Sequence, residues 1–111
     1  MRPSRACLEL LLDQIIEGAA IPRGIRQYPM TCADGRQVVL DRAWPELKVA
    51  VDADGLRWHG TAAQHRATTA RSRSIQNSGY RHLTYGWADC RESALATRRE
   101  LETIFAPLLA A

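Results

Sequence analysis

The sequence predicts a single α/β domain, in which a mixed sheet of about four strands is flanked by helices. Its 111 residues amount to one domain. Hydrophobic residues make up 46% of the chain and charged residues 24%, which is typical of a folded globular protein. Apolar residues recur at helical spacing near both ends of the chain and alternate with polar ones in its middle. The predicted order of elements is αβββαβα over residues 1–111.

The N-terminal half is predicted to form one helix followed by three strands. Ser4 is a good N-cap for a helix over about residues 5–19, where leucine and isoleucine recur at intervals of three and four. An Asp-Gly pair at 34–35, between two extended runs, is a strong hairpin signal. A second Asp-Gly pair, at 54–55, ends a run in which apolar and polar residues alternate. The three predicted strands cover residues 26–32, 37–42 and 47–53.

The C-terminal half is predicted to add a helix, a strand and a final helix. The second helix covers residues 61–78, is poor in large apolar side chains, and ends at Gly79, a common C-terminal cap. Residues 80–85 are predicted to form the fourth strand. Asp89 and Glu92 match a capping box, so we expect the final helix to begin there. The second helix is then the crossover connection of a mixed sheet.

Charges are distributed unevenly along the chain. The net charge is +3, yet no acidic residue occurs from position 55 to 88. The cations and histidines of that stretch are Arg57, Arg66, Arg71, Arg73, Arg81, His59, His65 and His82. Arginine pairs with phosphate through two parallel hydrogen bonds. The pattern favours an anionic partner, and the alternative interpretation is a solvated basic face.

Three aspartates fall at the ends of predicted strands. Asp41 lies at the end of the second strand, and Asp52 and Asp54 lie two residues apart at the end of the third, which places them on one face. Adjacent strands are about 4.8 Å apart, so these carboxylates can converge on one Mg²⁺ ion that activates water. His59 follows closely as a candidate general acid or base. The alternative interpretation is that these are solvated turn aspartates and an ordinary histidine.

Two longer segments carry a resemblance to a known family. Residues 39–59 read VLDRAWPELKVAVDADGLRWH, and residues 68–89 read TTARSRSIQNSGYRHLTYGWAD. The first has an Asp, then Trp-Pro, then an apolar strand ending in a carboxylate and Asp-Gly, then a His; the second has Arg, an aliphatic residue, Gly-aromatic and Trp-x-Asp at matching spacing. Together they resemble the small endonuclease-like domains related to very-short-patch-repair endonucleases, within the PD-(D/E)xK nuclease superfamily. The resemblance covers essentially the whole chain and implies a restriction-endonuclease-like fold.

The resemblance also implies roles for individual residues. It implies that Asp41 and Asp52 are ligands of Mg²⁺ (or Mn²⁺), and that Asp54 and His59 belong to the catalytic site. Proteins of this kind often add a glutamate from the first helix, and Glu9 is the candidate accessory residue here.

Several side chains of the basic segment are candidates for contact with DNA. Arg71 is expected to steady a phosphate in the catalytic site, or alternatively to form a structural ion pair with a site carboxylate. Arg57, Arg66 and Arg73 are candidate contacts to the DNA backbone, or else solvated cations. Trp58 is the best candidate for stacking on a base.

Two departures from the family pattern bear on activity. Thr68, a further candidate accessory residue, stands where the family has an Asp, and Asp52 is a shortened version of the family's strand Glu. The first hypothesis is a metal-dependent DNA endonuclease of the very-short-patch-repair-like type with weakened activity. The alternative is a catalytically impaired nuclease fold that acts as a DNA-binding or interaction module. A third and blander hypothesis is a small structural domain with a basic face.

The remaining features predict where the protein acts and with what. The three cysteines are far apart and show neither disulfide nor zinc-site spacing. We find no secretory signal and no apolar run that would span a membrane, so we expect a cytoplasmic protein. DNA is the expected partner, together with a second copy of the chain in a homodimer or a partner protein.

Overall fold

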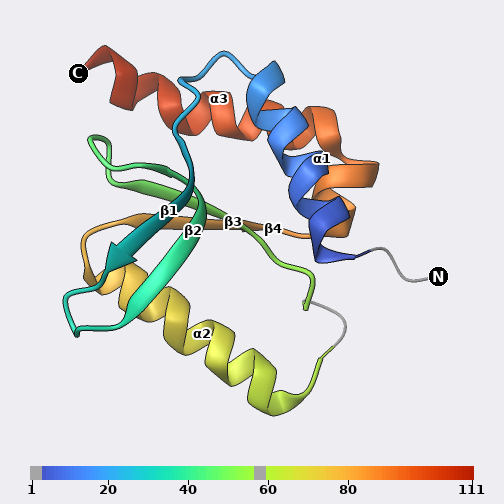
Figure 1. Ribbon diagram of the computed structural model, residues 1–111. Coiled ribbons are helices and arrows are strands. Elements are labelled where there is room, and N and C mark those ends of the chain that lie inside the picture. Colours follow the sequence, from blue (N-terminus) through green and yellow to red (C-terminus); the bar gives the residue numbers. More distant parts are fainter. Residues whose placement is uncertain (1–3, 57–59) are drawn as a thin grey trace.

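The computed structural model describes residues 4–56 and 60–111 and contains the predicted α/β domain (Figure 1). A four-stranded mixed sheet is flanked by helices, in the predicted order. The elements are α1 (Arg5–Gly18), β1 (Ile25–Thr31), β2 (Gln37–Trp44), β3 (Val49–Ala53), α2 (Ala62–Asn77), β4 (Arg81–Tyr85), a short π-helix η1 (Ala88–Glu92) and α3 (Ala94–Ala110). Within the described residues, no helix has both the length and the apolar character that crossing a membrane requires.

The sheet has the strand order β1-β2-β3-β4. Strands β1 and β2 form an antiparallel hairpin, and β3 continues antiparallel to β2, with Ala43 opposite Ala50. Strand β4 pairs in parallel with β3, with Val51 opposite Leu83. The parallel pair follows from the α2 crossover, since a helical connection returns the chain in its original direction.

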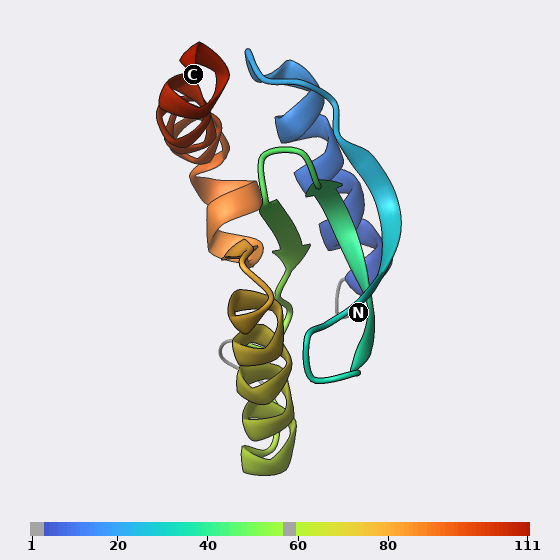
Figure 2. The same ribbon diagram turned by 90° about the vertical axis from the view of Figure 1, so that its left-hand side faces the viewer.

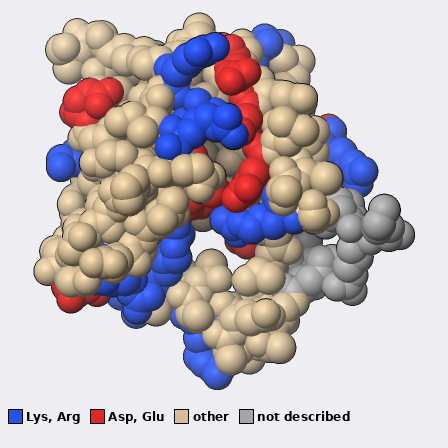
Figure 3. All heavy atoms as spheres, in the orientation of Figure 1, with Lys and Arg blue, Asp and Glu red and all other residues tan. Residues whose placement is uncertain are grey.

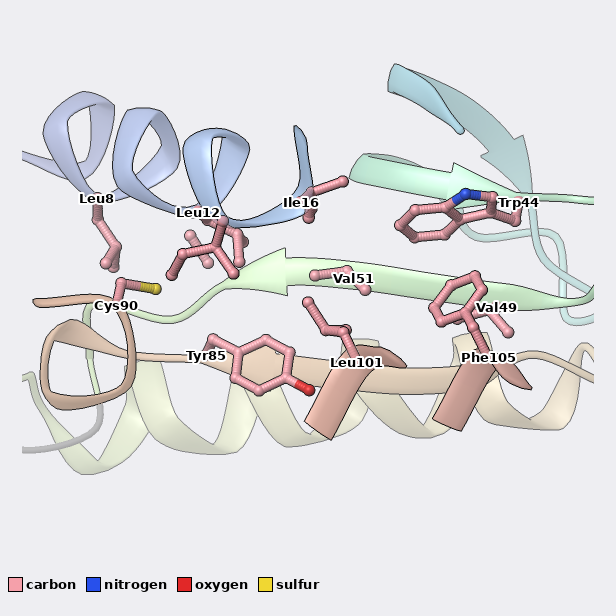
Figure 4. Close-up of a cluster of buried hydrophobic side chains, with 12 residues drawn as sticks. Leu8, Leu12, Ile16, Trp44, Val49, Val51, Tyr85, Cys90, Leu101 and Phe105 are labelled. Atoms are coloured by element: carbon pink, nitrogen blue, oxygen red, sulfur yellow. The ribbon is translucent and has the colours of Figure 1, made fainter. Parts of the chain in front are cut away.

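The helices form two layers, one on each face of the sheet (Figures 1 and 2). Helices α1 and α3 cover one face and enclose the larger core, where Leu12 of α1, Val51 of β3 and Leu101 of α3 are buried (Figure 4). Trp44 and Phe105 meet edge to face there, with ring centroids 4.7 Å apart. Trp44 is therefore a core residue.

Helix α2 covers the other face with few apolar contacts. Ile75 is its one large apolar side chain and packs against Leu40 and Ala50 in a smaller core. The predicted alternation of β3 explains the two layers, because Val49 and Val51 face α1 and α3 while Ala50 and Asp52 face α2. Most of α2 is left polar, and that polar surface lies beside the candidate site.

Several element boundaries differ from those the sequence predicts. Strand β2 continues to Trp44 and not only to residue 42, so Asp41 lies within the strand and not at its end as predicted. Strand β3 begins at Val49 and not at residue 47, because residues 45–48 form a turn in which Lys48 has a φ of 57°. The predicted capping box at Asp89 is wrong: its carboxylate accepts a hydrogen bond from the Gly86 N–H at 2.9 Å, three residues back, and the N-cap of α3 is Ser93. The chain passes through η1 first, and α3 begins at Ala94.

Candidate functional site

The side chains of Asp41 and Asp52 lie next to each other where β2 and β3 separate. The paired residues of these strands run from Trp44 and Val49 to Arg42 and Val51, so Asp41 and Asp52 come directly after the last pair. The Asp41 N–H donates to Asp52 Oδ1 at 2.8 Å, and the Ala53 N–H donates to Asp41 Oδ2 at 2.7 Å. Each carboxylate thus takes the place of a backbone carbonyl in the ladder and holds the partner strand.

The two carboxylates are held by groups from opposite layers. Arg5, in the first turn of α1, lies 3.3 Å from Asp41 Oδ2. Arg71 of α2 lies 2.9 Å from Asp52 Oδ2, and His82 Nε2 of β4 lies 2.6 Å from the same oxygen. Asp41 therefore points toward the α1 layer and Asp52 toward the α2 layer.

An irregularity in β2 produces this arrangement. Arg42 follows Asp41 directly, and yet both side chains contact α1: Arg42 lies 2.8 Å from Asp13. Side chains of a regular strand alternate between faces. Opposite Asp41 in β1 lies Gln27, whose φ of 48° is in the left-handed region that such residues rarely adopt. The hairpin therefore changes its side-chain alternation at the candidate site.

Asp52 is ionised, and neighbouring groups inside the protein balance its negative charge. Its side chain is 4% exposed. Burial alone raises the pKa of Asp52, but hydrogen bonds from His82, Arg71 and the Asp41 N–H outweigh burial and lower the pKa to about 2. Its charge is therefore balanced by Arg71 and by the N–H groups around it.

The pKa of Asp41 is shifted in the opposite direction. Burial raises the pKa of Asp41 to about 6, the nearby charge of Asp52 adds to this, and the Ala53 N–H and Arg5 only partly oppose it. Glu9 lies beside Asp41, and the Glu9 carboxylate accepts a hydrogen bond from Arg5 at 3.2 Å. Asp41 thus takes up a proton close to neutral pH, while Asp52 does not.

The arrangement does not fit the magnesium or manganese ion that the family resemblance implies. Among residues 4–56 and 60–111, no group of three or more His, Cys, Asp or Glu side chains is placed to hold a metal ion. Asp52 Oδ2 already accepts hydrogen bonds from Arg71 and His82, and the two aspartates face opposite layers. Mg²⁺ demands oxygen ligands in near-octahedral geometry. We therefore derive no catalytic step through a metal.

A cavity of about 280 Å³ opens beside Asp52. Arg71 lies at its wall with 29% of its side chain exposed, one end of its guanidinium on Asp52 and the other on the Val39 carbonyl at 2.8 Å. The two fixed ends hold the guanidinium plane in place. The cavity is lined by Arg5, Val39, Asp52, Ala53, Asp54, Leu56, Thr68, Arg71, His82 and Thr84.

A second cavity, of about 390 Å³, continues along α2. It shares Asp54, Thr68 and Thr84 with the first, so the two adjoin. Its other lining residues are Thr69, Ser72, Arg73 and Gln76. We call the two cavities together the α2 groove. Its walls are rich in hydroxyl groups and carry Arg71 and Arg73.

The remaining predicted site residues lie around this groove or outside the described residues. Asp54 lines both cavities, and its carboxylate accepts the Leu56 N–H at 2.9 Å, as a turn aspartate does. Thr68 lines both cavities as well. Arg66 and Arg73 are exposed on α2. The predicted roles of Arg57, Trp58 and His59 fall on residues that lie outside those the structure describes.

Sequence reasoning missed two residues that contact the aspartates. His82 is in β4, where parallel pairing with β3 puts residues 82 and 84 on the same face as Asp52. Alternation in both strands, combined with a parallel register, would have identified it. Arg5 carried no comparable signal, because its contact depends on how the first turn of α1 packs on the sheet.

On the face shown in Figure 3, acidic and basic side chains lie side by side around a hollow. Ion pairs among the described residues include those of Arg26 with Asp13, at 2.9 Å, and of Arg5 with Asp41, at 3.3 Å. Comparison of the chain with models of protein families, with curated proteins and with solved structures found no match. The function is therefore argued from the chemistry of the site itself.

Proposed function

We propose that the chain is a DNA-binding domain on a nuclease-like fold, and that the α2 groove holds the sugar-phosphate backbone without a divalent ion. The observation that carries this proposal is the state of Asp52. Its charge is balanced by Arg71 and His82, so it neither repels phosphate strongly nor offers itself freely to a metal. Arg71 is occupied by Asp52 and the Val39 carbonyl, so the phosphate contact falls to Arg73, which is exposed and lines the same groove.

The residues that line the groove favour contact with the sugar-phosphate backbone of DNA and not recognition of its bases. Threonine and serine hydroxyls donate hydrogen bonds to phosphate oxygens, and arginines add charge. Arg73 lines the groove and Arg66 is exposed on the same helix. Contacts of this kind are independent of base sequence and weaken as salt is raised, because binding releases counterions from the DNA. A cytoplasmic location and a dimer or partner protein belong to this proposal as predictions from the sequence.

The proposal is tested by fluorescence anisotropy with a labelled duplex at 50 and 200 mM salt, with and without EDTA. We expect binding that persists in EDTA and falls steeply with salt. Arg73→Ala should weaken binding and lower the slope of log K against log salt by about 1, the loss of one phosphate contact. Arg99→Ala is the matched control, since Arg99 is exposed on α3, across the sheet from α2. Absence of binding at low salt, or binding abolished by EDTA, would contradict the proposal.

A second candidate function is metal-dependent DNA cleavage by an endonuclease. The observation that favours it is that Asp41 of β2 and Asp52 of β3 lie next to each other, with Asp52 lining the cavity. Incubation of supercoiled plasmid with Mg²⁺ or Mn²⁺ tests it. Nicking by the wild type that is lost in Asp41→Ala would establish this function over a purely binding one. Thr68→Asp restores the family's acid at the groove, and a gain of nicking there would favour cleavage over binding alone.

A further inference from the structure

A chain of hydrogen bonds links a serine, a histidine and an aspartate across three elements. Ser72 Oγ of α2 lies 2.8 Å from His82 Nδ1 of β4, and His82 Nε2 lies 2.6 Å from Asp52 Oδ2 of β3. This is the connectivity of a nucleophile, a general base and the acid that orients the base. Nothing in the proposed DNA-binding function uses the Ser72 hydroxyl in this way.

The positions of the protons follow from the partners. Asp52 is ionised and can only accept, so His82 carries its proton on Nε2. When the imidazole is neutral, its Nδ1 accepts a hydrogen bond from the Ser72 hydroxyl. Gln76 Nε2 donates to Ser72 Oγ at 3.0 Å and does not compete for the hydroxyl proton. In that state the serine proton points at His82 Nδ1, 2.8 Å away.

The nucleophile is accessible and the base is shielded. Ser72 lines the 390 Å³ cavity of the α2 groove together with Arg73 and Gln76. The His82 side chain is only 2% exposed. A ligand in the cavity thus meets the serine oxygen first, and bulk water has little access to the imidazole. Nearby serines differ: Ser74 donates to Asp34 and Ser78 donates to the Ser74 carbonyl.

We propose that Ser72 is the nucleophile of a second, metal-free activity, the hydrolysis of small carboxylic esters that bear an anionic group. His82 acts as general base and Asp52 is a positioning residue. The anionic group is selected by Arg73 in the same cavity. The ester would occupy the same cavity as the DNA backbone, but the two activities are measured separately, one by labelling of Ser72 and the other by DNA affinity.

The reaction balances through one histidine. Ser72 Oγ bonds to the ester carbon as its proton passes to His82 Nδ1, and the carbonyl π electrons move onto the ester oxygen. Gln76, whose Nε2 lies 3.0 Å from Ser72 Oγ, is our candidate donor to that oxyanion. Collapse breaks the bond to the alcohol oxygen, which leaves with the proton from His82. Water then attacks the acyl-serine, its proton passes to His82, and the carboxylic acid departs as that proton returns to Ser72.

The test is covalent labelling of the folded wild-type chain with a fluorophosphonate, followed by mass-spectrometric mapping of the adduct. We expect the adduct on Ser72 and an initial burst with mono-4-nitrophenyl succinate. Ser72→Ala should abolish both, and Ser78→Ala should change neither. His82→Gln keeps a polar group of similar size but no base, and should slow labelling about a hundredfold or more.

The wild-type result decides the proposal even where a variant misfolds. Circular dichroism and thermal melting identify such variants, and they are then set aside. No adduct, an adduct on another residue, or labelling of Ser72 no faster than of Ser78 would overturn the proposal. The Ser72–His82–Asp52 chain would then be a structural network that fixes α2 to the sheet.

Discussion

Asp41 makes the protein less stable as its carboxyl group ionises. Its pKa is about 6 in the folded chain, against an ordinary value of 3.8, because burial and the charge of Asp52 disfavour the ionised form. Between these values the folded state binds more protons than the unfolded state, so stability falls as pH rises from about 4 to about 6. We expect Asp41→Asn to stabilise the protein at pH 7 by about 2 kcal/mol. Urea unfolding at pH 4 and pH 7 measures this, and an equal effect at both would contradict it.

Asp52 is predicted to behave in the opposite way. Its pKa of about 2 lies below the ordinary value of 3.8, so its contribution is complete above pH 4 and is lost as pH falls toward 2. Asp52→Asn leaves Arg71 and the buried His82 without their carboxylate, and we expect it to destabilise the protein by about 3 kcal/mol at pH 7. The same urea titration compares the two variants. A stabilising Asp52→Asn would mean that the carboxylate is not neutralised internally.

The sequence was enough to locate Asp41 and Asp52 but not to predict whether each carboxyl group is ionised. Alternation in β3 put Asp52 on the face opposite Val49 and Val51, and the order of the strands put Asp41 beside it. What decides the charge of each is the set of donors around it, and these come from Arg5, Arg71 and His82, residues far away in the chain. Contacts of this kind depend on tertiary packing, which local patterns do not encode.

The segment between α1 and β1 closes the larger core, and Gly24 is its tightest point. Gly24 has a φ of 72°, and a Cβ there would lie 2.7 Å from Trp44 Cε2 and 2.8 Å from the Ala43 carbonyl oxygen. The same segment accepts a hydrogen bond from Trp44 Nε1 at the Pro22 carbonyl, at 2.8 Å. Neither the backbone conformation nor the space admits a side chain, because the buried indole and the strand backbone have no room to move.

Gly24→Ala is therefore predicted to destabilise the protein by about 2 kcal/mol or more, through overpacking and left-handed strain. Gly18→Ala is the matched control, because Gly18 is helical and a Cβ there would only touch Arg98 at 3.9 Å. We expect that control to be neutral or to stabilise slightly, since alanine favours helix. Thermal melting of both variants measures the difference. Equal melting temperatures would show that the segment between α1 and β1 shifts to accommodate the added Cβ.

At the scale of the whole molecule, the sheet separates the larger hydrophobic core, which stabilises the fold, from the candidate site. The larger core lies between the sheet and α1 and α3, whereas α2 is held by Ile75 and by the polar network around Asp52 (Figures 2 and 4). The order of elements was predictable, because the turn signals and the spacing of apolar residues are local properties. The α2 groove was not, since it forms only where a polar helix crosses β4.

Because the two helical layers are packed unequally, we expect them to unfold locally to different extents. Hydrogen bonds in a layer that buries little apolar surface are lost in local unfolding before the global transition. We expect amide hydrogens of α2 to exchange faster than those of buried positions in α1 and α3, such as Leu12 and Leu101. If the groove binds DNA, a saturating duplex should slow exchange in α2 and leave α3 unchanged, which hydrogen-exchange mass spectrometry resolves. Protection spread evenly over all helices would contradict the two-layer account, and slowing confined to α3 would place the duplex on the other face.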